Sequence, residues 1–140
     1  MLILVIDGQG GGLGRQIVAA LREDDPRYTL HAVGVNSIAT AAMLKAGADT
    51  AATGENAVIV GCRKADVIVG PIGVVIADAM LGEVTPAMAA AVGQSRAKRV
   101  LIPMNQCDNT VVGVLEQPVG QLVQAAVRAV ALAAQEIRGV

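Results

Sequence analysis

The chain has 140 residues, enough for a single domain over 1–140 with its own hydrophobic core. Apolar residues make up 54% of it, with no Phe or Trp and one Tyr, which predicts a core of small branched side chains packed on a parallel sheet. A net charge of −1, with no basic stripe and no aromatic stacking surface, argues against nucleic-acid binding.

Short apolar runs alternate with segments of helical periodicity, which predicts repeated βα units. We expect strands at 2–6, 28–35, 49–53, 67–69 and 99–103. We expect helices at 12–23, 37–45, 55–63, from Pro86 onward and at 118–138, with a helical turn at 76–81. Residues 57–61 are rich in β-branched side chains and would also suit a hairpin with 66–70, but a parallel sheet needs a crossover helix there.

These units predict an α/β protein, a three-layer Rossmann-like sandwich with a parallel sheet of about five strands in the order 3-2-1-4-5. Ligands of such sheets bind outside the carboxyl ends of the strands, here in a crevice between the first and fourth strands. Segments rich in Gly, Asn, Thr or acidic residues converge on that edge, and they are 7–15, 36–37, 53–56, 70–73 and 105–109.

The first of these segments, Asp7-Gly8-Gln9-Gly10-Gly11-Gly12-Leu13-Gly14-Arg15, joins an apolar strand to a helix. Glycines let the backbone approach a ligand, and the amides and dipole of a helix N-terminus attract a phosphate or carboxylate. The spacing resembles the T-G-x-x-x-G-x-G turn of short-chain dehydrogenases, including the arginine that follows. The alternative is a tight βα turn that binds nothing.

Three departures separate the chain from those dehydrogenases. Asp7 precedes the first glycine and would repel a pyrophosphate, so we expect it to accept loop N–H groups or to bind a cation. Asn36, in place of an acid, ends the second strand, where it would bond a ribose hydroxyl or lead the next helix. Tyr28 is followed four residues later by Ala32, where those enzymes have Lys, and lies at the wrong edge of the sheet, which excludes their reaction.

Few side chains at this edge suit catalysis. Cys107 is a candidate nucleophile, and Asp7, Asp108 and Glu55 are candidate acids or bases, with Asp78 and Glu83 weaker ones. The single histidine, His31, lies within a strand, which favours a structural role. The two cysteines, Cys62 and Cys107, have no metal-ligand spacing, so we expect reduced thiols and no metal site.

The leading interpretation is therefore a nucleotide- or dinucleotide-binding protein, with NAD, NADP, another adenine nucleotide or S-adenosylmethionine as ligand. The residues predicted to bind it are Gly8, Gln9, Gly10, Gly11, Gly12, Leu13, Gly14, Arg15, Asn36, Ser37, Thr53, Gly54, Glu55, Asn56, Gly70, Pro71, Ile72, Gly73 and Asn105. Two alternatives stay open: a small enzyme that uses Cys107 or Asp108 beside a cofactor, and a non-catalytic ligand sensor or assembly subunit.

The last helix is apolar over more than one face, which predicts a homodimer. The amino terminus has no basic leader pattern, and no apolar run reaches about 20 residues without charge. We therefore expect a soluble cytoplasmic protein.

Five segments together resemble a family of short bacterial proteins known as a domain of unknown function. They are Val5-Ile6-Asp7-Gly8-Gln9-Gly10-Gly11-Gly12, Met43-Leu44-Lys45-Ala46-Gly47-Ala48, Thr53-Gly54-Glu55-Asn56-Ala57, Gly70-Pro71-Ile72-Gly73 and Ile102-Pro103-Met104-Asn105. The resemblance spans essentially the whole chain. It implies a Rossmann-like domain and brings no established substrate, reaction or catalytic residue.

Overall fold

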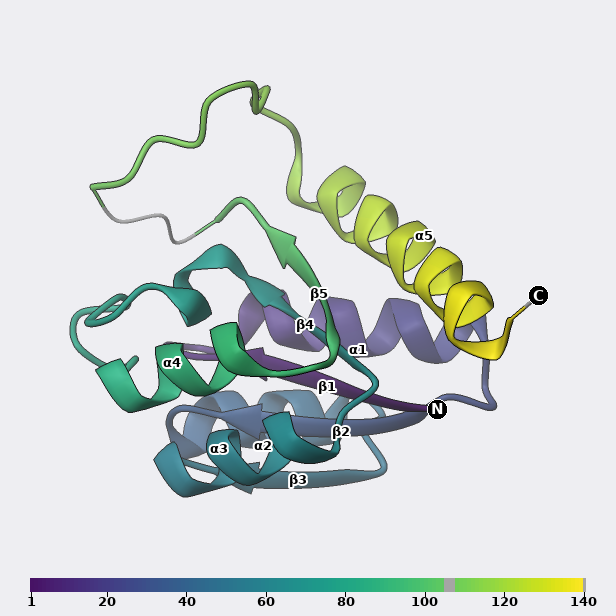
Figure 1. The fold of residues 1–140 in the computed structure, drawn as a ribbon, viewed down its shortest axis with the longest axis horizontal. Helices are drawn as coiled ribbons and strands as arrows, with labels where there is room; N and C mark the ends of the chain where they lie inside the picture. Colours follow the sequence, from purple (N-terminus) through teal and green to yellow (C-terminus); the bar gives the residue numbers. More distant parts are fainter. Residues whose placement is uncertain (105–107, 140) are drawn as a thin grey trace.

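A computed structural model of the chain describes residues 1–104 and 108–139. Within these ranges one parallel sheet has five strands in the order β3-β2-β1-β4-β5 (Figure 1). The strands are β1 (Leu2–Asp7), β2 (Thr29–Gly34), β3 (Thr50–Thr53), β4 (Val67–Pro71) and β5 (Lys98–Ile102). The expected strand order 3-2-1-4-5 is confirmed.

Helices cover both faces of the sheet. They are α1 (Gly12–Asp24), α2 (Ser37–Lys45), α3 (Glu55–Lys64), α4 (Pro86–Gln94) and α5 (Val119–Arg138). Helices α1, α2 and α5 share one apolar cluster with Ile3 and Val5 of β1, while α3 and α4 share the other with Leu4 and Ile6. Successive side chains of a strand point to opposite faces, so β1 supplies both cores, and the expected three-layer architecture is confirmed.

Local signals in the sequence explain where several helices begin. The Asn36 side chain accepts a hydrogen bond from the Ala39 amide at 2.9 Å, and the Thr85 hydroxyl accepts one from the Met88 amide at 3.1 Å. Both are N-caps, which satisfy amides that a helix leaves without an internal partner. Residues 57–61 lie inside α3, so the crossover helix is correct and the hairpin alternative is wrong.

The region after β4 differs from expectation. The strand continues through Gly70 and Pro71, because Gly70 has no Cβ to collide with the Ile6 carbonyl oxygen, which would lie 2.5 Å away. A short 3₁₀ helix, η1 (Ile72–Val75), follows, and the helical turn expected at 76–81 is wrong. Positive φ at Asp78, Met80 and Leu81 is incompatible with a right-handed helix, so this segment is an irregular loop.

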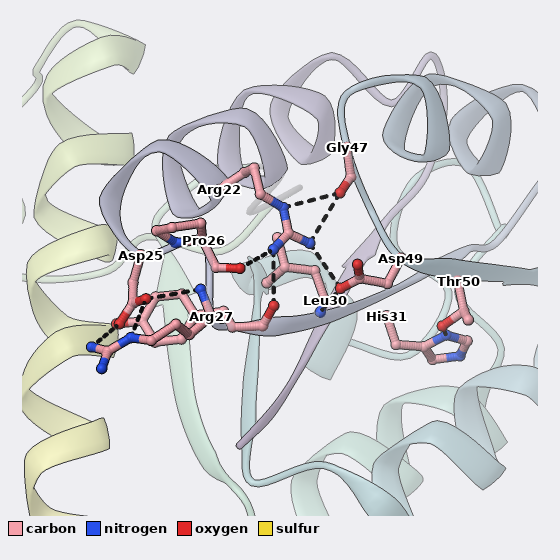
Figure 2. Close-up of polar contacts among 10 residues, drawn as sticks. Arg22, Asp25, Pro26, Arg27, Leu30, His31, Gly47, Asp49 and Thr50 are labelled. Atoms are coloured by element: carbon pink, nitrogen blue, oxygen red, sulfur yellow. Dashed lines mark hydrogen bonds and ion pairs between the residues drawn. The ribbon is translucent and has the colours of Figure 1, made fainter.

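Polar contacts hold the edge of the sheet opposite the carboxyl ends of the strands (Figure 2). The Arg22 guanidinium of α1 donates to the carbonyls of Pro26, Tyr28 and Gly47 and lies 2.8 Å from the Asp49 carboxylate. The planar guanidinium of this one arginine thus links α1 to the segments that lead into β2 and β3.

His31 and Thr50 form a contact at the same edge (Figure 2). The His31 Nδ1 atom lies 2.6 Å from the Thr50 hydroxyl, and the two residues are direct partners in the register of β2 and β3. Burial lowers the pKa of His31. The contact gives His31 the structural role that its place within a strand predicted.

Helix α5 packs one apolar side against α1 and β5. The buried residues on that side are Val123, Ala126, Val127, Val130, Ala133 and Ala134. Leu132 keeps 59% of its surface exposed, and Ile137 is also exposed. The wide apolar arc is therefore only partly covered by the rest of the described chain. Among the described residues no helix is long and apolar enough to span a bilayer.

Candidate functional site

The glycine turn, residues 8–14, carries the chain from the end of β1 into α1. Gly11 is the N-cap of α1, with a left-handed φ of 72°, and a Cβ there would lie 2.7 Å from the Ala39 Cα of α2. A Cβ on Gly14 would lie 2.6 Å from the Met43 Sδ and 2.7 Å from the Asp7 Cβ. These two glycines allow α1 to pack closely on α2 and β1, so their place in the turn has a structural reason.

Asp7 lies beneath this turn. Its side chain accepts a hydrogen bond from the Gly14 amide at 2.6 Å, and the residue is only 2% exposed. Burial raises the pKa of this carboxyl, and the nearby charge of Glu83 also raises it, while the amides of Gly14 and Gly8 lower it. The expectation that Asp7 accepts loop N–H groups is confirmed.

Three amides of the glycine turn are open. The N–H groups of Gly10, Gly12 and Leu13 form no hydrogen bond with any described residue. A Cβ built on Gly10 or on Gly12 would meet no atom within 4 Å, so the space above both is free. Arg15 is exposed in the first turn of the same helix. This is the part of the turn that a ligand can reach.

The remaining part of the turn is covered by Glu83, from the loop between η1 and α4. Its Oε1 atom accepts a hydrogen bond from the Gln9 amide at 2.7 Å. The Asn36 Nδ2 atom lies 3.2 and 3.1 Å from the two Glu83 oxygens and donates to the Gln9 carbonyl at 2.8 Å. Gln9 and Asn36, both predicted to bind the ligand, therefore already contact an acidic side chain of the protein.

The 76–84 loop that carries Glu83 is held by its own backbone. The Asp78 amide donates to the Val84 carbonyl at 2.8 Å, and the Val84 amide donates to the Ala79 carbonyl at 3.1 Å. Met80 is buried at 3% exposure, and its Sδ would lie 2.6 Å from a Cβ on Gly8. Gly8 thus lets this loop lie directly against the glycine turn.

Sequence reasoning named Glu83 only as a weak candidate acid or base. The residue lies 74 positions from Gln9 along the chain, between the helical turn predicted at 76–81 and the helix predicted from Pro86. No spacing rule joins two such positions. The only local signal was Gly8 itself, since a buried glycine at the end of a strand indicates that another part of the backbone or a side chain comes close.

The segment 53–56 is also at this edge. The Thr53 and Thr40 hydroxyl oxygens lie 2.7 Å apart, and Gly54 has a φ of 99°. The Glu55 carboxylate accepts a hydrogen bond at 2.6 Å from the hydroxyl of Thr85, the N-cap of α4. Asn56 is exposed at the start of α3, as Ser37 is at the start of α2.

The other predicted segments are less accessible or lie elsewhere. Gly70 and Pro71 are buried as the last residues of β4, so only Ile72 of the segment 70–73 is partly exposed. Asp108 is exposed in the connection between β5 and α5. Asn105 and Cys107 lie outside the described residues.

Three grooves lined by described residues lie away from the glycine turn. A groove of about 500 Å³ lies between α3 and the end of α4 and is lined in part by Cys62, Arg63 and Arg96. Burial raises the pKa of the Cys62 thiol to about 11. In the described part of the chain no group of three or more His, Cys, Asp or Glu side chains could hold a metal ion.

Comparison with known proteins gives a family and a distant structural likeness. No curated protein matches the chain. Among solved structures, a dodecameric FMN-dependent UbiX-like decarboxylase from Escherichia coli O157:H7 is similar at 17% identity, over 99% of this chain and 94% of that chain, with a TM-score of 0.42. So distant a likeness carries no argument about ligand or reaction. The family model described as Domain of unknown function (DUF3842) matches residues 2–135, and the chain therefore belongs to that family.

Proposed function

We propose that this chain is a cytoplasmic nucleotide-binding protein that holds the phosphate of an adenine nucleotide or dinucleotide over the glycine turn. The observation that carries the proposal is the set of three open amides, on Gly10, Gly12 and Leu13, at the start of α1. Amides that converge at a helix N-terminus bind anions, because the helix dipole adds to their hydrogen bonds.

The charges around the turn restrict where the phosphate binds. Glu83 already takes the Gln9 amide, and its carboxylate repels an anion placed there. Arg15 is exposed in the first turn of α1, close in the chain to the open amides. The phosphate therefore binds between Gly10 and Leu13, with the Arg15 guanidinium available as a counter-charge. Ser37 and Asn56 are exposed on the same edge and are available to the rest of the ligand.

A thermal-shift screen with NAD, NADP, S-adenosylmethionine, ATP and AMP tests this proposal. At least one nucleotide should raise the Tm of the wild type in proportion to its concentration, since a ligand that binds only the folded state stabilises it. Gly12→Asp should abolish the shift, because it places a negative charge in the open space over the amides.

Gly120→Asp is the matched control, because Gly120 also lies in the first turn of a helix with open space around it. This variant should keep the full ligand shift. The proposal would be contradicted if no nucleotide raises the Tm of the wild type. It would also be contradicted if Gly12→Asp and Gly120→Asp both lose the Tm shift.

We propose further that the chain forms a homodimer in which exposed Leu132 of α5 lies at the contact between the two copies. Leu132 keeps 59% of its surface exposed, on the side of the helix opposite the residues that are buried against α1 and β5. Sedimentation of the wild type should give a dimer, and Leu132→Lys should shift it toward monomer. A wild type that sediments as a monomer at all accessible concentrations refutes this assembly.

A further inference from the structure

We propose that Glu83 selects the sugar of the bound nucleotide: its carboxylate accepts hydrogen bonds from the hydroxyls of an unmodified ribose and repels a 2′-phosphate. This inference rests on the nucleotide binding proposed above. The expected ligands are adenine nucleotides with a free 2′-hydroxyl. Glu83 is the residue that distinguishes them from nucleotides with a 2′-phosphate.

The Glu83 carboxylate lies close to the end of β2. In Rossmann-type sheets an acidic residue at the end of the second strand reads the ribose hydroxyls. Here β2 is followed by Val35 and half-exposed Asn36, and neither is acidic. The Asn36 side-chain amide nitrogen nevertheless lies 3.2 and 3.1 Å from the two Glu83 oxygens. A loop that follows β4 thus brings a carboxylate to the place where the local sequence lacks one.

This carboxylate is held in place before any ligand arrives. The Gln9 amide donates to it at 2.7 Å, and the Glu83 amide donates to the Met80 carbonyl at 3.2 Å. Met80 is buried against the glycine turn, which anchors the loop. A side chain fixed in this way loses little conformational freedom when it binds a ligand.

The Glu83 carboxylate also has spare acceptor capacity. A carboxylate offers about four acceptor positions. Among the described residues the Gln9 amide and the Asn36 amide group occupy Oε1, and the Asn36 group also contacts Oε2, which keeps about one position open. Glu83 forms no ion pair with a basic side chain in the part of the chain that the structure describes. Its free acceptor position suits a sugar hydroxyl, and its unpaired charge opposes a phosphate on the same sugar.

Three related probes test the inference by isothermal titration calorimetry: AMP, 2′-deoxy-AMP and adenosine 2′,5′-bisphosphate. The wild type should bind AMP about tenfold more tightly than either of the others, since a hydrogen bond to a charged group contributes on the order of 1.5 kcal/mol. Glu83→Gln keeps the shape of the side chain and an oxygen for the Gln9 amide, but it removes the charge. It should bring AMP and the bisphosphate to within about threefold of each other.

Glu23→Gln is the control, because Glu23 is exposed near the other end of α1 and its change removes the same charge. It should leave all three affinities unchanged. If Glu83→Gln alters the three affinities by one common factor, or leaves the wild-type preference intact, Glu83 does not select the sugar, while the nucleotide proposal stands. If the wild type binds none of the three probes while another nucleotide binds at the glycine turn, the sugar inference alone is overturned. If no nucleotide binds there, both proposals fail.

Discussion

The Oδ2 atom of Asp7 lies 2.6 Å from the amide nitrogen of Gly14, so the last residue of β1 is tied to the first turn of the helix that follows it. At the other end of the glycine turn, the Gln9 amide donates a hydrogen bond to the Glu83 carboxylate. The outer amides on either side are satisfied by carboxylates of the protein itself. Those of Gly10, Gly12 and Leu13 between them have no hydrogen-bond partner among the described residues.

The buried Asp7 carboxyl predicts a specific dependence of stability on pH. Its folded-state pKa is raised above the usual value of 3.8 for an aspartate, chiefly by burial. Between these two pKa values the folded chain holds a proton that the unfolded chain has released. The contribution of Asp7 to the free energy of unfolding is therefore greatest at low pH and declines as the pH rises through the raised pKa.

Asp7→Asn removes this titration and keeps an oxygen to accept from the Gly14 amide. The free energy of unfolding of the wild type minus that of the variant should therefore decrease as the pH rises from about 4 to neutral. Urea unfolding of both proteins across this range measures the difference, in which the other titrating groups largely cancel. A difference that grows with pH would mean that the Asp7 pKa is lowered by folding.

Two glycines of α1 should respond in opposite ways to the same substitution. Gly14→Ala places a Cβ 2.6 Å from the Met43 Sδ and 2.7 Å from the Asp7 Cβ, so we expect a loss of about 1–3 kcal/mol of stability. Gly12→Ala enters open space at a helical position and should gain up to about 1 kcal/mol. Chemical denaturation of the two variants gives both values. Equal losses would show that the tight packing beneath Gly14 is not present.

The Thr85 hydroxyl joins two helices on the same face of the sheet. It caps α4 through the Met88 amide and donates to Glu55 in the first turn of α3 at 2.6 Å. Thr85→Ala should cost about 1 kcal/mol, mostly from the lost cap. Thr85→Ser keeps the hydroxyl and should recover most of that stability. Equal unfolding midpoints for the Ala and Ser variants would assign the effect to the lost methyl group instead.

The sequence was sufficient for most of the fold because its signals are local. Apolar runs such as 2–6 identify buried strands, and Asn36 and Thr85 mark the starts of α2 and α4 by capping chemistry. Once the units alternate, the right-handed crossover rule restricts the strand order, and the sheet has the expected order.

The parts that could not be predicted depend on contacts between distant segments. The apolar pattern of 76–81 suits a helix, but the segment is a loop that includes residues with positive φ, and it closes over the glycine turn. From the sequence, Gly70 was expected to lie just after a strand. In the structure it continues β4, because a residue without a Cβ leaves room for the Ile6 carbonyl oxygen. Glu83 reaches Gln9 only through this tertiary arrangement, so its role has no signature in the local sequence.

The most direct test of the nucleotide site is a titration of the ¹⁵N-labelled protein with ADP, followed through its backbone amide resonances. The amide resonances of Gly10, Gly12 and Leu13 should shift at the lowest ADP concentrations and by the largest amounts, because the phosphate hydrogen-bonds to these amides. Unchanged resonances of these three residues at saturating ADP, or changes confined to the groove between α3 and α4, would contradict this prediction.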